Sequence, residues 1–436
     1  MCMTPSRALF ALTLSAMSAS AAVIGASVAA ESITESRIAA LPRAQQAAWR
    51  EYVARSVRQL RADRAFLEAE LKTAGLASAP IPPNGSAARS MPLNRPAEWY
   101  GGEEARRIAD IIVSFQTPAG CWSKNLNLTD HARRPGESFA PNNLSAHLGP
   151  GDFDTPHDPA WNYVGTLDND ATTTELQFLA RVAAAAKEGE AYRASLLRGL
   201  EYLLAAQFPN GGWPQVWPLE GGYHDAITFN DGAVTETLEL LEDVADGKDG
   251  FAFVTESLRA RAKASVAKGI ECLLATQIVE KGHRTVWAQQ HDALNLHPVA
   301  GRNYEPAALC GSESAAMILF LMRLPQPGPA VVEAVHAAAE WFRKTAIYGK
   351  AYERGADGRR LVSVEGAGPI WARFYEIGSG RAIFGDRDKS IHDDVNEISA
   401  ERRNGYSWYN AAPQAALDRY AEWSANHPRA REAPRK

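Results

Sequence analysis

The sequence lacks the features that would place it in several large protein classes. It is poor in cysteine, with four in 436 residues, so it is no disulfide-rich scaffold. It contains no P-loop, dinucleotide-binding fingerprint or zinc-protease motif. It has no excess of positive charge, with 46 Lys and Arg against 51 Asp and Glu. We therefore expect no nucleic-acid partner, because such proteins usually carry a basic surface.

Long apolar runs are also scarce, and the one candidate lies at the N-terminus. Arg7 precedes residues 8–30, which are small and apolar and carry no charge. Val28-Ala29-Ala30 has the small residues that a signal peptidase accepts, and the run is less hydrophobic than a membrane helix. We therefore predict a cleaved secretory signal over residues 1–30 and a secreted protein, periplasmic or extracellular. The rest of the chain is predicted to have no membrane span.

Three cysteines remain after this cleavage, namely Cys121, Cys272 and Cys310. They can form one disulfide at most, and their spacing matches no zinc site. The composition, 46% hydrophobic and 22% charged, is that of an ordinary soluble globular protein. The fold must therefore depend on its hydrophobic core, and we expect a monomer.

The predicted mature chain divides into three parts. Residues 31–78 have a helical composition with a charged, solvated face. Residues 79–90 are rich in Pro, Ala and Ser, which predicts a linker or surface loop. Residues 91–436 form the large unit, with further helices predicted at residues 172–187, 233–244, 312–323 and 331–345.

A short pattern recurs three times in the large unit: an apolar helix end, a glutamine, a glycine-bearing turn and a tryptophan. It spans Gln116 to Trp122, Gln207 to Trp213 and Gln277 to Trp287. The unequal intervals exclude a solenoid of fixed period. Unequal helical repeats with long loops favour a curved array of antiparallel helix pairs. We predict a mainly all-α fold, a partial α/α toroid with a smaller, partly β C-terminal section.

Two long segments, residues 124–170 and 351–407, interrupt the helical pattern. Loops of this length inside a compact domain are usually functional. We therefore expect the active site in a cleft between the helical array and the C-terminal section.

Acidic residues gather at two predicted helix starts, Asp168-Asn169-Asp170 and Asn230-Asp231. Each of them alone is typical of a helix N-cap, and Thr172-x-x-Glu175 resembles a capping box. Together they also offer several hard oxygens to a Ca²⁺ ion. Both uses stay open, because a capping carboxylate keeps one oxygen free.

Arginines stand out in the second half of the chain. Arg302, Arg373 and Arg387 lie in glycine- and aromatic-rich surroundings of a chain whose net charge is negative. This setting favours recognition of carboxylates, which arginine binds through two parallel hydrogen bonds. Arg402 and Arg403 are predicted to be solvated surface charges.

Seven short motifs occur in a fixed order along the chain. They are residues 166–172 (TLDNDAT), 210–215 (NGGWPQ), 227–231 (ITFND), 302–306 (RNYEP), 369–377 (PIWARFYEI), 384–388 (FGDRD) and 397–406 (EISAERRNGY). In this order they resemble polysaccharide lyase family 10, the helical pectate lyases. The resemblance covers most of the mature chain. One departure is Ala288, where a cysteine would be expected; it removes a possible disulfide partner but no catalytic group.

The resemblance implies endolytic cleavage of polygalacturonate by Ca²⁺-dependent β-elimination, in a partial α/α toroid. It assigns the catalytic base to Arg302. By the same resemblance, the calcium ligands are Asp168 and Asp231, with the adjoining Asp170. The implied substrate-binding residues are Arg373, Arg387, Asn169 and Asn230.

The chemistry of elimination is consistent with these residue types. Removing the C5 proton of a uronate spreads negative charge towards its C6 carboxylate, which nearby cations stabilise. An arginine base conflicts with the rule that arginine stays protonated, so we predict activity that rises towards alkaline pH.

Two other functions stay open. A toroidal glycoside hydrolase acting on uronic-acid sugars would use Asp168 and Asp231 as an acid–base pair. A non-catalytic pectin-binding protein would use the arginines only to hold galacturonate. Product analysis separates the three, because only a lyase forms an unsaturated product.

Overall fold

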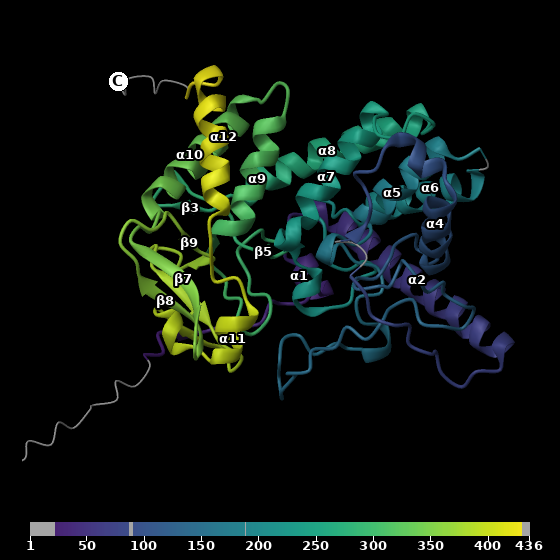
Figure 1. Cartoon of the computed structure of the whole chain (residues 1–436), viewed down its shortest axis with the longest axis horizontal. Coiled ribbons are helices and arrows are strands. Elements are labelled where there is room, and N and C mark those ends of the chain that lie inside the picture. Colours follow the sequence, from purple (N-terminus) through teal and green to yellow (C-terminus); the bar gives the residue numbers. More distant parts are fainter. Residues whose placement is uncertain (1–21, 87–89, 188, 430–436) are drawn as a thin grey trace, which may run out of the picture.

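The computed structural model describes residues 22–86, 90–187 and 189–429 (Figure 1). Residues 1–21 of the predicted signal and residues 87–89 of the predicted linker lie outside this description. Helices are the main regular structure of the described chain, as predicted. No helix in the described ranges has an apolar stretch long enough to cross a bilayer.

The N-terminal helical segment packs on the array instead of standing apart from it. It consists of α1 (Glu35–Ala39) and α2 (Arg43–Ala74). The two are separate because Pro42 precedes α2 with extended backbone, which starts a helix but cannot continue one. On α2, Tyr52 is buried and its hydroxyl donates to the Ala206 carbonyl at 2.9 Å.

Two rows of helices make up the array, and the chain alternates between them. The outer row contains α4 (Glu103–Phe115), α6 (Glu190–Ala206), α8 (Glu256–Thr276) and α10 (Pro329–Thr345). The inner row contains α5 (Thr173–Ala185), α7 (Ala233–Asp246), α9 (Gly311–Arg323) and α12 (Ala412–Asn426). Helices pack against neighbours in their own row and in the other. This is the predicted partial α/α toroid.

The C-terminal section is partly β, as predicted. Its five-stranded antiparallel sheet has the order β1-β12-β11-β10-β6. The strands are β1 (Gly25–Ala26), β6 (Leu309–Cys310), β10 (Phe374–Tyr375), β11 (Ala382–Gly385) and β12 (Ser390–His392). The predicted signal, which ends at residue 30, therefore includes a segment that pairs with this sheet.

Shorter elements complete the section and the loops. A hairpin joins β7 (Lys350–Gly355) to β8 (Gly358–Ser363), and α11 (Ala400–Gly405) packs against it. Three two-residue ladders pair β2 (Ile227–Thr228) with β5 (Gln290–His291), β3 (Val279–Glu280) with β4 (His283–Arg284), and β9 (Trp371–Ala372) with β13 (Tyr409–Asn410).

One hydrophobic core extends from Trp49 on α2 through the helices of the array to Phe384 on β11, and so joins the array to the C-terminal section. Among the described residues the three cysteines are buried, free thiols, so the disulfide that the sequence left open is not formed there. The core therefore holds the two sides of the molecule together without a cross-link.

Candidate active site

The turn after each outer helix is anchored by a buried tryptophan. Its indole N–H donates to a carbonyl in the preceding helix at 2.7–2.9 Å. The four pairs are Trp122 with Ile112, Trp213 with Leu203, Trp287 with Leu273 and Trp371 with Phe342. The sequence predicted the first three. The fourth was missed because Ala346 stands at the end of α10, where the other repeats have a glutamine.

The glutamines lock each turn to the next outer helix. Gln116 Nε2 donates to Gly120 in its own turn and to Ser195 on α6, at 2.9 and 2.8 Å. Gln207 and Gln277 repeat this arrangement with the next helices along the row. The repeat is therefore a device that fixes the ends of the outer helices.

A polar residue stands two positions after each of these tryptophans, and the first three of the four line the cleft described below. The four are Lys124, Gln215, Gln289 and Arg373. Lys124 Nζ lies 2.6 Å from Asp168 Oδ2, and Gln215 Nε2 donates to Asp168 Oδ1 at 2.9 Å. We missed the first three as site residues, although their shared distance from the repeated tryptophan is a signal in the sequence.

The acidic residues do not cap helices, so the capping prediction is wrong. Thr172 has φ 67°, whereas an N-cap needs extended backbone, and no side chain caps α5 or α7. Its hydroxyl donates instead to the Thr166 carbonyl at 2.8 Å. Asp231 also has a positive φ, 48°. Such backbone in non-glycine residues is uncommon and clusters at functional sites.

Asp168 and Asp231 face each other across Asn230. The Asn230 amide donates to Asp231 Oδ2 at 2.9 Å and to Asp168 Oδ1 at 3.4 Å. Burial alone would raise the pKa of Asp168, but Lys124 and other cations lower it to about 2. Burial and the neighbouring Asp168 raise the pKa of Asp231 to about 7. Cations therefore offset the charge of Asp168, whereas Asp231 makes no ion pair within the described ranges and keeps its carboxylate available for a cation.

Two neighbours of this pair have different surroundings. Asn169 lines the same cavity as Asp168 and Asp231, the smaller of the two described below, and its amide donates to Asn125 Oδ1 at 3.4 Å. Asp170 lines neither of the two cavities described below. Its carboxylate interacts with Glu236, whose pKa is raised to about 8 by burial first and by Asp170 second. The structure therefore separates Asp170 from the pair with which the sequence grouped it.

Arg302 lies at the centre of the site with its side chain 33% exposed. Its Nε and Nη2 donate to the two Glu305 oxygens at 3.1 and 2.6 Å. The Tyr406 hydroxyl donates to the same carboxylate at 2.7 Å. Burial alone would lower the pKa of Arg302, but Glu305 more than offsets this and raises the pKa well above its ordinary value. In the free protein Arg302 is thus a rigidly held cation.

Arg387 and Arg402 flank the Tyr304 ring, with guanidinium carbons 5.3 and 4.3 Å from its centroid. Both pair with Glu401, whose pKa is lowered to about 2 by hydrogen bonds from Arg402 and Arg387. The prediction that Arg402 and Arg403 are solvated is wrong, because they are only 4% and 7% exposed. Arg403 bonds backbone carbonyls instead. Adjacent charges on a short helix gave no sign of this burial.

Arg373 is placed behind the cleft surface. It pairs with Glu313, and its Nη2 donates to Asn230 Oδ1 at 3.1 Å. Its Nε donates to Gln289 Oε1 at 3.3 Å. It lines neither cavity, so its observed contacts position Asn230, whereas the sequence predicted direct substrate binding.

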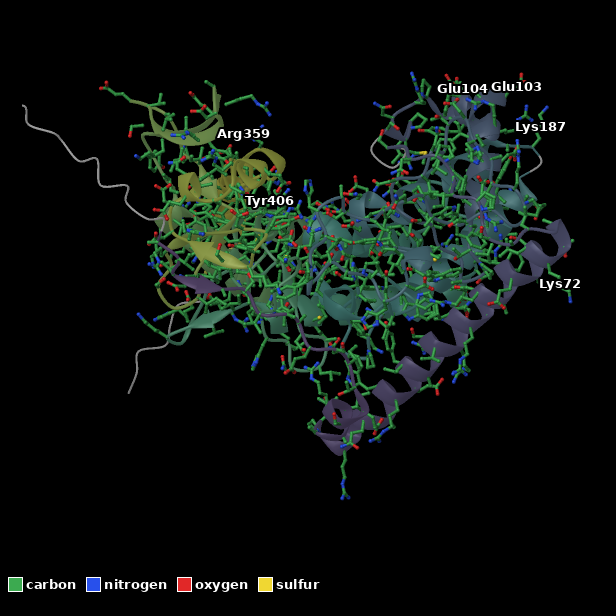
Figure 2. All side chains as sticks on the ribbon, turned by 90° about the horizontal axis from the view of Figure 1, so that it is seen from below. Lys72, Glu103, Glu104, Lys187, Arg359 and Tyr406 are labelled. Carbon is green, nitrogen blue, oxygen red and sulfur yellow. The ribbon has the colours of Figure 1, made fainter. Side chains whose placement is uncertain are left out.

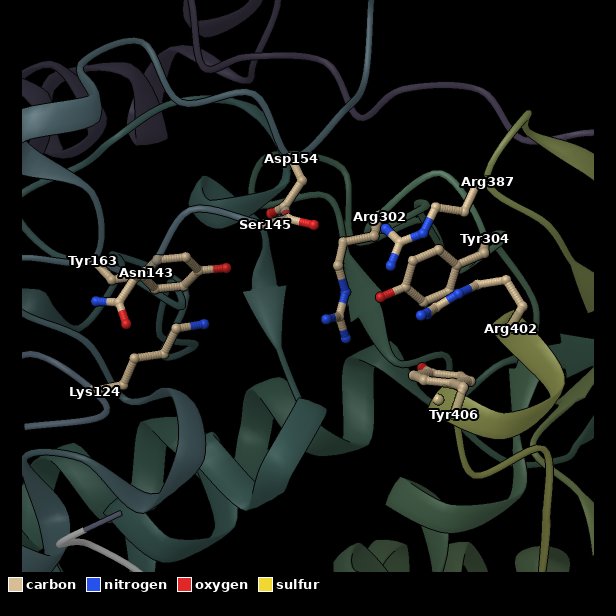
Figure 3. A pocket seen from close by; sticks show the side chains of 11 residues that line it. Lys124, Asn143, Ser145, Asp154, Tyr163, Arg302, Tyr304, Arg387, Arg402 and Tyr406 are labelled. Atoms are coloured by element: carbon tan, nitrogen blue, oxygen red, sulfur yellow. The ribbon is translucent and has the colours of Figure 1, made fainter. Parts of the chain in front are cut away.

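Two adjoining cavities of 280 and 220 Å³ form one cleft and share Lys124, Tyr163, Arg302 and Tyr406. Figure 3 shows the side chains that line the larger cavity. Figure 2 places Tyr406 on the C-terminal section. The two ends of the cleft differ in charge. The larger cavity is basic, and its charged residues are Lys124, Arg302, Arg387 and Arg402 with Asp154. The smaller adds the carboxylates of Asp168, Asp231 and Glu305.

The donor set at the acidic end fits a Ca²⁺ ion that is only partly coordinated by the chain. Within the described ranges, no group of three or more His, Cys, Asp or Glu side chains could hold a metal. Asp168 and Asp231 offer two carboxylates, whereas Ca²⁺ takes six to eight oxygens. Water and an acidic ligand would have to supply the rest.

Comparison with known proteins identifies the family. The pectic acid lyase family model matches residues 116–417. The chain is 31% identical to the family 10 polysaccharide lyase from Cellvibrio cellulosa, over 76% of this chain and 96% of that one, with a TM-score of 0.63. A variant of that lyase in complex with trigalacturonic acid gives 30% identity, coverages of 77% and 98%, and a TM-score of 0.63. Curated protein sequences gave no match. The chain therefore belongs to polysaccharide lyase family 10, the pectic acid lyases.

Proposed function

We propose that this pectate lyase cleaves α-1,4-linked polygalacturonate endolytically, by Ca²⁺-dependent β-elimination with Arg302 as the base. The observation that carries the proposal is the separation of charge within one cleft. A basic end suits uronate carboxylates, an acidic end suits a divalent cation, and Arg302 lines both. The trigalacturonic acid bound by the related lyase supports the substrate class.

The basic end would orient the polymer. Arg387 and Arg402 are held by Glu401 and by the Tyr304 ring, so their guanidinium groups need little reordering to bind carboxylates. Because Arg302 lies between the two cavities, sugars can occupy both sides of the scissile bond. Binding on both sides is what cleavage within a polymer requires.

The acidic end would hold Ca²⁺ between Asp168 and Asp231. When bound there, Ca²⁺ supplies positive charge beside a substrate carboxylate and makes the C5 proton more acidic. Lys124 and Gln215 keep the Asp168 carboxylate ionised and oriented. Asn230, itself held by Arg373, keeps the two carboxylates together.

Arg302 would take the C5 proton through Nη1. Glu305 engages Nε and Nη2, whereas Nη1 has no hydrogen-bond partner among the described residues. The Arg302 side chain lines the cavity (Figure 3). The electron pair of the C5–H bond becomes the C4–C5 double bond, the C4–O4 bond breaks, and the leaving oxygen takes a proton from water. Since Glu305 raises the pKa of Arg302, the neutral base is scarce at neutral pH and the rate should rise with pH.

The test is to mix the purified enzyme with polygalacturonate and to follow the ultraviolet absorbance of the C4–C5 double bond, with Ca²⁺ and with a chelator. A rise that the chelator stops, with oligomers of mixed length appearing early, is the expected result. New reducing ends without absorbance would mean hydrolysis and give Asp168 and Asp231 the catalytic roles. If neither absorbance nor new reducing ends appeared, the protein would be a non-catalytic binding protein.

A further inference from the structure

Residues 22–30 are integrated into the C-terminal section, although they belong to the segment expected to be removed. The Ile24 and Ser27 amides donate to the carbonyls of Ile391 and Lys389, both at 2.8 Å. Ser27 is buried, and Ile24 packs against the core. An uncovered edge strand invites pairing with other chains. Through β1, this segment covers the outer edge of β12.

Ala22 precedes β1 and lies beside a carboxylate. Its backbone nitrogen lies 3.1 Å from Glu397 Oε2. The same oxygen is 3.4 Å from Nδ1 of His392, on β12. A peptide N–H at this place makes an ordinary hydrogen bond, but a free α-ammonium would make a stronger, charge-assisted one. Glu397 is therefore suitably placed to bind a chain terminus at Ala22.

The preceding sequence supplies a cleavage site at the matching position. Ala19-Ser20-Ala21 has the small residues that signal peptidases require at the first and third positions before the cut. Cleavage there leaves Arg7 followed by an apolar stretch within residues 8–17, and such stretches span about 7–15 residues. Cleavage after Ala30 would extend the uncharged stretch well beyond that length.

We propose that a signal peptidase hydrolyses the Ala21–Ala22 peptide bond, so that the α-ammonium of Ala22 pairs with Glu397. Water adds across the bond, leaving a carboxylate on Ala21 and a protonated amine on Ala22. Residues 22–42 then form a strap between the two sides of the molecule. One end pairs with β12, and at the other Arg37 Nη2 lies 2.5 Å from Asp292 Oδ2 in the array (Figure 1).

Ala22 and Glu397 line neither cavity of the cleft. Residues 22–42 also precede the part matched by the family model, which begins at residue 116.

The first test is to express the full chain with its own leader in a Gram-negative host and to sequence the N-terminus of the exported enzyme. The expected first residue is Ala22; Glu31, any other residue or an uncut chain would overturn the proposal. Ala21→Phe should block or displace cleavage, whereas the matched change Ala30→Phe should leave the cut after Ala21. The opposite pattern would also overturn it.

The second test examines the terminal ion pair. Chains are prepared with a free amine on Ala22 or on Ser32, each with and without Glu397→Gln. In the longer chain, E397Q should lower Tm by about 2 °C or more. In the shorter chain its effect should be clearly smaller, because the ammonium partner is gone. Equal effects in both chains would rule out the pair.

Discussion

The two walls of the cleft differ in charge and in how the chain builds them. The carboxylate wall, Asp168 with Asn230 and Asp231, lies where consecutive inner helices begin, beside turns fixed by the tryptophan repeat. The arginine wall, Arg387 with Arg402, comes from the irregular C-terminal section and depends on Glu401 and on the Tyr304 ring.

This difference separates two tasks. The carboxylate wall brings like charges together in buried surroundings, as the raised pKa of Asp231 shows. Such an arrangement favours a cation. The arginine wall is already neutralised in part by Glu401, so its guanidinium groups are pre-oriented for carboxylates. Arg302 belongs to neither wall and contacts both ends of the cleft.

The largest expected effect comes from removing the group between the walls. Arg302→Ala should lower kcat by about 10²–10⁴-fold, the usual contribution of a positioned base. Binding of trigalacturonate, measured by calorimetry, should weaken less than tenfold, because both walls remain. A kcat within tenfold of the wild type would exclude Arg302 as the base.

The carboxylate wall is tested by two aspartates that the sequence could not tell apart. Asp231→Asn should lower activity at moderate Ca²⁺ by about 100-fold and remove the rise in Tm on adding Ca²⁺. Asp170→Asn should do neither, since Asp170 interacts with Glu236 outside both cavities. Equal losses of activity and of the Ca²⁺-induced rise in Tm in both variants would show that Asp170 also belongs to the metal site.

The arginine wall is tested by adjacent residues of α11. Arg402→Ala should raise KM for polygalacturonate about 10–100-fold, the equivalent of one lost charge-assisted hydrogen bond. Arg403→Ala should lower Tm but change KM little, because Arg403 bonds backbone carbonyls. If Arg403→Ala raised KM as much as Arg402→Ala, the effect of Arg402→Ala could not be assigned to a direct contact with the substrate.

Ca²⁺ binding at the carboxylate wall should depend on pH. Ca²⁺ needs ionised Asp231, whose pKa is raised from 3.8 to about 7, so the Kd for Ca²⁺ should rise up to tenfold per unit below pH 7 and be flat above it. In the Ca²⁺-free protein, the stability due to this raised pKa is fully present below the unfolded value and is lost as pH rises through about 7. Asp231→Asn should abolish both trends in titrations and thermal melts.

The two walls also differ in how well the sequence predicts them. The repeated turns and the acidic pair depend on short segments, so the sequence predicted the toroid and grouped Asp168 with Asp231, which the structure places together. The arginine wall depends on contacts between distant segments, such as Asn303 donating to the Arg387 carbonyl at 2.7 Å. No local pattern reports these contacts. Arg402 was therefore misassigned, and the contacts of Arg373 with Glu313 and Asn230 could not be foreseen.

One measurement tests directly whether the walls act together. Ca²⁺ is titrated calorimetrically into the inactive Arg302→Ala variant with and without trigalacturonate, and Arg302→Ala/Asp231→Asn corrects for Ca²⁺ bound by the sugar alone. Because the chain supplies only two carboxylates, trigalacturonate should tighten Ca²⁺ binding at least about tenfold, and Ca²⁺ should tighten trigalacturonate binding equally. A Ca²⁺ affinity unchanged by the sugar would contradict the account.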